Sequence, residues 1–323
     1  MLKKLVRKAV SVILVFAMFM EAGTPLAYAA GEAAQDARRP GSYDEAVYSK
    51  DIAEIINNAS KGDIVKASDD TVIAENTERR EEYTKSYKLV GGSNAVFLYP
   101  VAVHEKDGSG EWAEIDNLLK EEIDKEGRKI FTAGGANTNT SFLAVPKNGE
   151  TLELNTKYGS IGWGLSSGTF DTEGVYTDPE VRRGYEKLQI KSLSGVLTYK
   201  EVLPGTDLAY QLLGHDIEEA IYINTPQAAE RAASDGFEYD LTLEGYRAEL
   251  KDNRIYLYAD GQEDPQYIIS AAFMEDAALE ESGDIRIELK GSEDGYTVSI
   301  YPDSEWLTAP ERVFPIEIDP TIT

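Results

Sequence analysis

The sequence predicts an all-β protein of mainly antiparallel, sandwich-like lobes, with a short N-terminal helix and a cleaved signal peptide. Three observations lead to this class. From Tyr87 onward, apolar and polar residues alternate in run after run, Gly-rich turns separate the runs, and helical periodicity is scarce. A strand with one apolar face and one polar face is what an antiparallel sheet with one buried side requires.

The first 29 residues are typical of a secretory signal peptide. A basic start that includes Lys3 and Arg7 precedes a 12-residue apolar run from Ala9 to Met20, and the small-residue site Ala27-Tyr28-Ala29 follows. The run is shorter than the roughly 20 residues that a membrane-spanning helix needs. We therefore expect cleavage after Ala29, a secreted or cell-surface location and no integral membrane anchor.

Residues 30–76 are expected to form a flexible and helical leader. Residues 30–43 are rich in Ala, Gly, Arg and Pro without periodicity, whereas the apolar spacing between Asp44 and Asn58 predicts a short helix. Two β lobes are expected at residues 77–187 and 188–323, because residues 166–187 lack alternation. The same segment is compatible with one long loop inside a single large β domain.

A turn near residue 108 predicts a β-hairpin. Val101 and Val103 lead into Lys-Asp-Gly-Ser-Gly at residues 106–110, and Trp112 and Ile115 begin the return strand. Asp-Gly between β-rich runs is a strong short-range hairpin signal. The same alternation predicts further strands at residues 161–165, 208–212, 237–243, 285–289 and 296–300, with a turn at 291–295 between the last two.

The C-terminal segment predicts a strand that closes the second lobe. Its apolar residues are Val313, Phe314, Ile316 and Ile318. We expect Trp306 to pack beneath the connection that leads into this strand, because a large indole side chain contributes most to stability when it is buried.

Composition excludes several classes of function. The formal net charge is −26, and removal of residues 1–29 leaves 28 basic and 57 acidic side chains, a charge of −29. Such a surface repels phosphate backbones and anionic membranes, so we expect no nucleic-acid partner. The sequence contains no cysteine, which excludes thiolate zinc sites and cysteine catalysis.

One short motif suggests a hydrolase. Gly164-Leu165-Ser166-Ser167-Gly168 matches G-x-S-x-G, in which a strand-to-helix turn exposes a nucleophilic serine. The residues from Thr169 to Thr177 show no helical period, and His215 is the only downstream histidine. We therefore interpret the motif as a glycine-rich loop and Ser166 as a residue without a nucleophilic role.

The two histidines, His104 and His215, lack the spacing of a metal site. Both are expected to be hydrogen-bonded or solvated turn residues. The acidic residues are too many for any pair to be chosen as a glycosidase pair. We expect no catalytic residue, no metal ligand, no cofactor-binding residue and no cofactor.

Four segments, in this order, point to one family. They are Glu78-Arg79-Arg80 with Lys85-Ser86-Tyr87-Lys88 and Leu98-Tyr99-Pro100; the hairpin from Pro100 to Asn117; the run Leu197-Thr198-Tyr199-Lys200-Glu201-Val202-Leu203-Pro204-Gly205-Thr206-Asp207-Leu208; and Glu305-Trp306-Leu307 with Val313-Phe314-Pro315-Ile316-Glu317-Ile318-Asp319-Pro320-Thr321. The series resembles the N-terminal region of secreted wall-associated RHS/YD-repeat proteins of Gram-positive bacteria. In that family the region usually precedes a DNRLRE-type β domain, repeats and often a variable toxin or adhesin tip.

The resemblance implies a non-enzymatic exported structural or interaction module, the N-terminal part of a cell-surface RHS-type protein used in contact, adhesion or toxin delivery. Its partners would be downstream domains of the same polypeptide, or cell-wall or host glycans. The alternatives are a carbohydrate-binding module and a secreted hydrolase. Trp112 and Trp306 are interpreted as core aromatics rather than sugar platforms. Where the family often has a Lys-Glu pair, this chain has Glu218-Glu219, which removes the cation.

Overall fold

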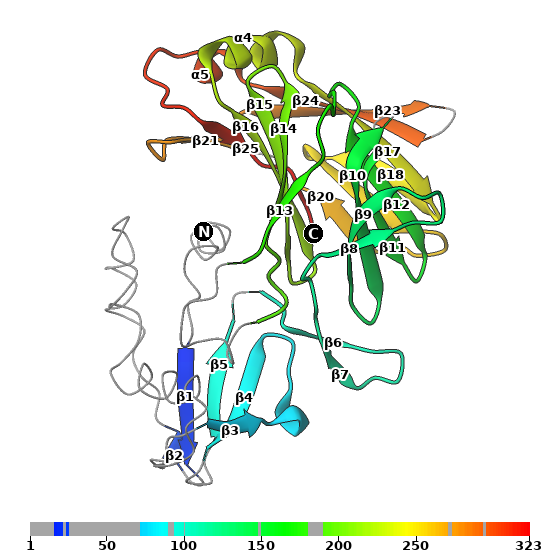
Figure 1. The fold of residues 1–323 in the computed structure, drawn as a ribbon, viewed down its shortest axis with the longest axis vertical. Helices are drawn as coiled ribbons and strands as arrows, with labels where there is room; N and C mark the ends of the chain where they lie inside the picture. Colours follow the sequence, from blue (N-terminus) through cyan, green and yellow to red (C-terminus); the bar gives the residue numbers. More distant parts are fainter. Residues whose placement is uncertain are drawn as a thin grey trace. The chain divides into compact units, whose positions relative to one another are not determined.

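The computed structural model describes residues 16–21, 24–25, 72–89, 94–99, 101–147, 150–179, 190–270, 273–292 and 295–323. The chain divides into two compact units, with residues 1–115 and 180–192 in unit 1 and residues 116–179 and 193–323 in unit 2 (Figure 1). Strands dominate both units and pair antiparallel, so the predicted all-β class is confirmed. The helix predicted between Asp44 and Asn58 lies outside the described residues.

Unit 1 contains a five-stranded sheet of order β2-β1-β5-β4-β3 and a two-stranded hairpin. The sheet strands are β1 (Phe16–Glu21), β2 (Thr24–Pro25), β3 (Val72–Glu75), β4 (Thr84–Leu89) and β5 (Asn94–Leu98), and the 3₁₀ helix η2 (Thr77–Arg79) follows β3. The hairpin pairs β6 (His104–Lys106) with β7 (Trp112–Glu114), which confirms the predicted turn. Strand β3 lies inside the leader that was predicted to be flexible and helical up to residue 76, so that prediction was wrong at its C-terminal end.

The first sheet of unit 2 has eight strands in the order β23-β24-β17-β12-β11-β10-β9-β8. Its strands are β8 (Lys120–Ile123), β9 (Lys129–Gly134), β10 (Thr138–Lys147), β11 (Glu150–Thr156), β12 (Gly159–Leu165), β17 (Phe237–Glu244), β23 (Ile285–Ser292) and β24 (Gly295–Pro302). Because this sheet takes strands from both predicted lobes, the boundary expected near residue 187 does not separate two sheets.

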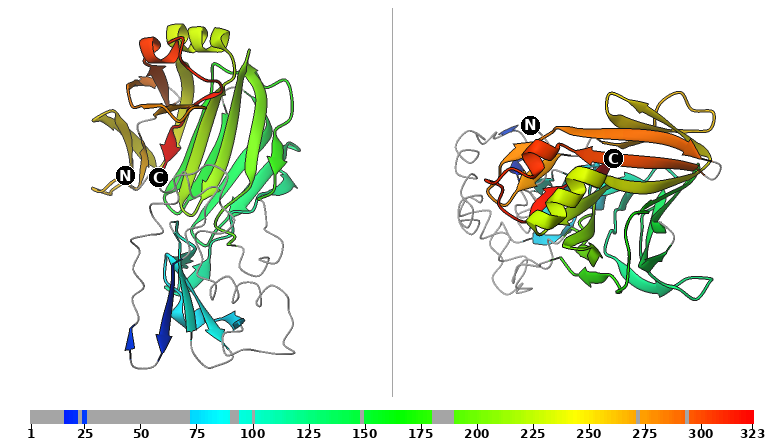
Figure 2. Two further views of the ribbon diagram at one scale, coloured as in Figure 1. Left: turned by 90° about the vertical axis from the view of Figure 1, so that its left-hand side faces the viewer. Right: turned by 90° about the horizontal axis from the view of Figure 1, so that it is seen from above.

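The second sheet of unit 2 has eleven strands, eight of them in the order β13-β14-β15-β16-β26-β20-β19-β18. Its strands are β13 (Val175–Thr177), β14 (Val196–Leu203), β15 (Thr206–Leu213), β16 (Asp216–Ile223), β18 (Tyr246–Lys251), β19 (Arg254–Ala259), β20 (Tyr267–Ile269), β21 (Met274–Asp276), β22 (Glu281–Ser282), β25 (Ile316–Ile318) and β26 (Thr321–Ile322). Helices α4 (Pro226–Asp235) and α5 (Ser304–Leu307) lie side by side at one end of unit 2 (Figures 1 and 2). Among the described residues, no helix has both the length and the apolar character to cross a bilayer.

The two sheets of unit 2 face each other across one apolar core (Figure 2). Phe142 of β10 packs against Tyr210 of β15, with ring centroids 5.2 Å apart. The Tyr199 hydroxyl, from β14, donates a hydrogen bond of 2.7 Å to the Leu143 carbonyl of β10. The alternating residues predicted to face inward do so, as on β12, where Ile161, Trp163 and Leu165 are buried.

Two carboxylates stabilise the Pro-Gly turn between β14 and β15: Glu201 Oε2 accepts from the Gly205 N–H at 2.9 Å, and Asp207 binds the flanking residues. Asp207 accepts hydrogen bonds from the Glu201 backbone N–H at 2.9 Å and from Lys200 Nζ at 2.7 Å, and Asn224 adds a third. Gly205 has φ +72°, and a Cβ there would approach Thr225 Oγ1 at 2.8 Å. Glycine is required at this position because of both its backbone conformation and the close neighbour.

The C-terminal segment adds strands to the eleven-stranded sheet, as expected, but these strands lie in its interior and the apolar strand is shorter than predicted. Strand β25 pairs with β16 and β21, and β26 pairs with β16 and β20. Val313 lies outside the strand and is 46% exposed. Trp306 is partly buried against the core, and the Arg312 guanidinium lies 4.3 Å from its ring centroid.

We predict that Ile318→Ala destabilises unit 2 by about 2–5 kcal/mol, because Ile318 is fully buried and the substitution leaves a cavity. Val313→Ala in the same segment is the matched control, and its effect should stay within about 0.5 kcal/mol. Urea-unfolding midpoints of the two variants measure the difference. Equal midpoints would show that β25 does not contribute to the core.

Candidate functional site

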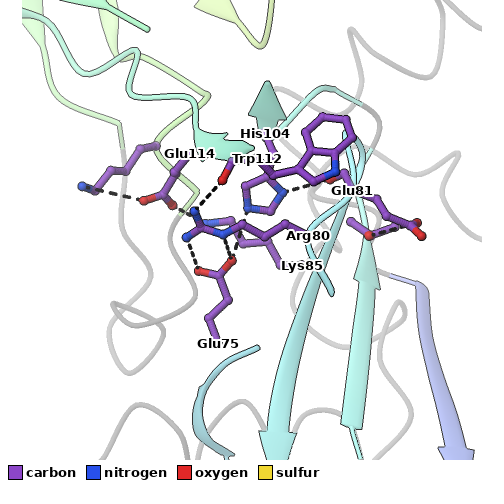
Figure 3. A network of polar contacts seen from close by, with 9 residues as sticks. Glu75, Arg80, Glu81, Lys85, His104, Trp112 and Glu114 are labelled. Carbon is purple, nitrogen blue, oxygen red and sulfur yellow. Dashed lines mark hydrogen bonds and ion pairs between the residues drawn. The ribbon is translucent and has the colours of Figure 1, made fainter. Parts of the chain in front are cut away.

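A cluster of buried or partly buried ionisable side chains lies in each of the two units. In unit 1, the ion network consists of Glu75, Arg80, Lys85, His104 and Glu114 (Figure 3). Strand β3 ends at Glu75, Arg80 follows η2, and Lys85 lies on β4. His104 begins β6 and Glu114 ends β7, so the network joins strands from three parts of the sequence.

The Arg80 guanidinium binds Glu75 through two parallel contacts. Arg80 Nε lies 2.8 Å from Glu75 Oε1, and Arg80 Nη2 lies 3.1 Å from Oε2. Arg80 Nη1 also donates to the Trp112 carbonyl at 3.3 Å. Lys85, which is almost fully buried, pairs with Glu114. Bidentate arginine–carboxylate contacts fix geometry as well as charge.

His104 is fully buried, and both of its ring nitrogens have partners. Nδ1 lies 2.9 Å from the Glu81 carbonyl oxygen and Nε2 lies 3.2 Å from Glu75 Oε1. A carbonyl oxygen only accepts, and an ionised carboxylate also only accepts. Both contacts are therefore hydrogen bonds when each ring nitrogen carries a proton.

The partners of Glu75 determine its protonation. Burial alone would raise its pKa, but the hydrogen bonds from His104 and Arg80 outweigh that effect, and the pKa falls to about 2. The carboxylate is therefore ionised at neutral pH. The Glu75–His104 contact joins β3 to β6, and the Lys85–Glu114 ion pair joins β4 to β7, so the network connects these two strands to the hairpin. Within the described residues, no group of three or more His, Cys, Asp or Glu side chains could hold a metal ion.

The residues that the sequence singled out have different local surroundings in the structure. Ser166 donates from Oγ to the Glu238 carbonyl at 3.1 Å, and the described residues 166–179 contain strand β13 but no helix, so the elbow geometry is missing. His215 is exposed at the turn between β15 and β16. His104, expected to be a turn residue, is instead the buried centre of the ion network.

Unit 2 holds a carboxylate that sequence reasoning missed. Glu219 is 3% exposed and occupies an inward position on β16, between Ile217 and Ile221. Trp163 Nε1 donates to Glu219 Oε2 at 2.7 Å, and the Tyr239 hydroxyl donates to Oε1. Alternation on β16 was the available signal, because it places Glu219 in the same row as the buried isoleucines.

Burial dominates the electrostatics of Glu219. Desolvation raises its pKa to about 7, although the polar contacts with Tyr210, Tyr239 and Trp163 lower it. The Tyr210 hydroxyl, from the residue opposite Glu219 on β15, approaches the carboxyl without completing a hydrogen bond of normal geometry. The two clusters thus shift a glutamate pKa in opposite directions, because only Glu75 has cations beside it.

Comparison with known proteins gives three curated relatives of one kind. The chain is 25% identical over 253 residues to tRNA nuclease WapA of Bacillus subtilis (strain 168), covering 76% of this chain and 10% of the relative. The tRNA(Glu)-specific nuclease WapA of Bacillus subtilis subsp. natto and the tRNA3(Ser)-specific nuclease WapA of Bacillus spizizenii match at 25% and 24% identity over the same length and shares. No family model matches the chain, and no solved structure matches it.

These relatives correct one expectation. The sequence predicted a protein without enzymatic activity, whereas all three relatives are named as tRNA nucleases. The chain spans about a tenth of the length of each relative. The absence of a nucleic-acid partner, expected from the net charge, stays a prediction.

We predict that Glu75→Gln destabilises unit 1 by about 2–3 kcal/mol at pH 7. The folded-state pKa of Glu75, about 2, lies below its ordinary value of 4.5, so its contribution is present above about pH 4.5 and is lost as the pH falls toward 2. Hydrogen exchange of peptides covering residues 84–98 reports on unit 1 at pH 7 and pH 4. The exposed Glu78→Gln is the control and should leave exchange unchanged. Equal protection in the two variants would contradict a stabilising role for the ion network.

Proposed function

We propose that this chain is an exported β module of a cell-surface protein of the same kind as the WapA tRNA nucleases, used in contact or toxin delivery. The observation that supports this most directly is the 253-residue match, which covers three quarters of the chain. The resemblance of four ordered sequence segments to wall-associated RHS/YD-repeat proteins agrees with it. The signal-peptide pattern of residues 1–29 supports export.

The structure also suggests how such a module would act. Unit 2 buries two large sheets against each other, and unit 1 is stabilised by the ion network, so each unit is a preformed scaffold. Rigid scaffolds suit the presentation of attached segments at a cell surface. The proposed partners are further domains of the same polypeptide.

The glycan-binding alternative gains no support from the tryptophans. Trp163 is buried in the core, stacked on Tyr239 with centroids 4.4 Å apart. Trp112 and Trp306 are partly buried, and each has a cation over its ring, Lys106 and Arg312 respectively. A sugar-binding platform needs an open indole face.

Fractionation of a Gram-positive host that expresses the chain from Met1 tests the location. We expect the protein in the cell-surface and medium fractions, with an N-terminus at Ala30, because the small-residue site ends at Ala29. Edman sequencing or mass spectrometry of the exported protein identifies the terminus. Retention of the intact chain in the cytoplasm would contradict the export proposal.

A chimera tests the role in a nuclease protein. The aligned segment of Bacillus subtilis WapA is replaced by the matching segment of this chain, and tRNA cleavage is measured in the cell-surface fraction. We expect the chimera to keep its tRNA cleavage at the surface. A chimera without residues 312–323 is the control and should lose surface display, since it lacks β25 and β26. If the complete chimera remains inside the cell, the proposed role is wrong.

A further inference from the structure

Glu219 is a carboxyl group placed in a row of apolar side chains on β16. Its neighbours in the inward row of β16 are Ile217, Ile221 and Ile223, all buried. Strand β16 belongs to the eleven-stranded sheet, whereas Trp163 and Tyr239, which donate to Glu219, belong to the eight-stranded sheet. The carboxyl group therefore makes a polar contact across the interface between the two sheets.

The groups that face Glu219 include no cation. Tyr239 faces it from β17, Trp163 from β12 and Tyr210 from β15, and Tyr199 of β14 packs on the Tyr210 ring. On the other side of β16, the Glu219 backbone N–H donates to the Pro320 carbonyl at 3.2 Å. Among the residues that the structure describes, no Lys, Arg or His pairs with this carboxyl group.

A fully buried carboxylate without a cation is expensive, and such groups usually take up a proton instead. Two hydrogen-bond donors offset part of this cost, since an ionised carboxylate accepts from both Trp163 and Tyr239. Desolvation and hydrogen bonding thus act in opposite directions on the pKa of the Glu219 carboxyl group. The site is balanced between its two protonation states rather than fixed in one.

We propose that Glu219 forms a proton-dependent contact that holds the two sheets of unit 2 together. When the carboxyl group is protonated, the sheets are held together by a neutral polar contact inside an apolar core. When it is ionised, the same position carries an unpaired charge, and the interface around β12, β16 and β17 opens more often. The protonation state of Glu219 therefore makes the rigidity of unit 2 depend on pH.

The sign of the effect follows from the burial. The folded-state pKa of Glu219 is about 7 and lies above its ordinary value of 4.5. Its stabilising contribution is complete below about pH 4.5 and is lost as the pH rises through 7. Between pH 5 and pH 8 we expect the opened population around these strands to rise by roughly a hundredfold.

Infrared spectroscopy tests the protonation state directly. We expect a carbonyl band of a protonated buried carboxyl group at pH 5 that disappears with a midpoint near pH 7. Glu219→Gln should lack the band, and Glu218→Gln, the neighbouring position on the opposite face of β16, should keep it. A spectrum without the band at pH 5 in the folded protein would overturn the proposal.

A second variant distinguishes a Glu219 whose protonation controls the interface from a Glu219 that only fills space in the core. Tyr239→Phe removes one donor to the ionised carboxylate and keeps the ring that stacks on Trp163. We expect the infrared midpoint to move to higher pH, because the ionised form loses a stronger, charge-assisted hydrogen bond than the protonated form does. A midpoint that stays unchanged in a folded Tyr239→Phe protein would contradict the hydrogen-bond balance.

Hydrogen exchange, corrected for the intrinsic pH dependence of exchange, measures the opening of β12, β16 and β17. Wild type and Glu218→Gln should both show the rise between pH 5 and pH 8, whereas Glu219→Gln should show exchange that changes little. If Glu219→Gln keeps the full rise, another group controls the opening and the proposal is wrong.

Discussion

The packing of two sheets against each other through β16 is the constraint on which unit 2 depends. This strand pairs with β15 on one side and with β25 and β26 on the other. It therefore joins strands β13 to β15 to the strands formed by the C-terminal segment. Its inward row also meets the eight-stranded sheet at Trp163 and Tyr239. Close-packed interiors transmit strain, so a change of charge on β16 reaches both sheets.

The two buried clusters show how one residue type can serve opposite purposes. Glu75 lies against Arg80 and His104, and its lowered pKa keeps it ionised at neutral pH. Glu219 has only neutral donors, and burial raises its pKa. The cost of desolvation is similar in kind for both residues, and the presence of neighbouring cations decides the outcome. The first cluster stabilises a fixed structure, whereas the second is suited to respond to pH.

Alternation and turn chemistry made the β class and many strands predictable from sequence, because they act within a few residues. The hairpin of β6 and β7 and the inward row of β12 follow from such local patterns. Long-range pairing was not predictable: the eight-stranded sheet joins β12 to β17, which local signals cannot show. The ion network was missed for the same reason, since Glu75 and His104 lie 29 positions apart. The burial of Glu219 could have been inferred from alternation, but its partners Trp163 and Tyr239 could not.

Most of the segments that carry the resemblance to wall-associated proteins have a structural role: they form turns or strands. The Pro204-Gly205 turn is held by Glu201 and Asp207, and the Pro-Ile-Glu-Ile-Asp-Pro-Thr segment supplies β25 and β26. Side chains at these positions set a turn or complete a sheet, so a substitution there is expected to cost more stability than one at an exposed position. The roles that the structure gives these segments are therefore roles in the fold, and the fold by itself assigns no activity.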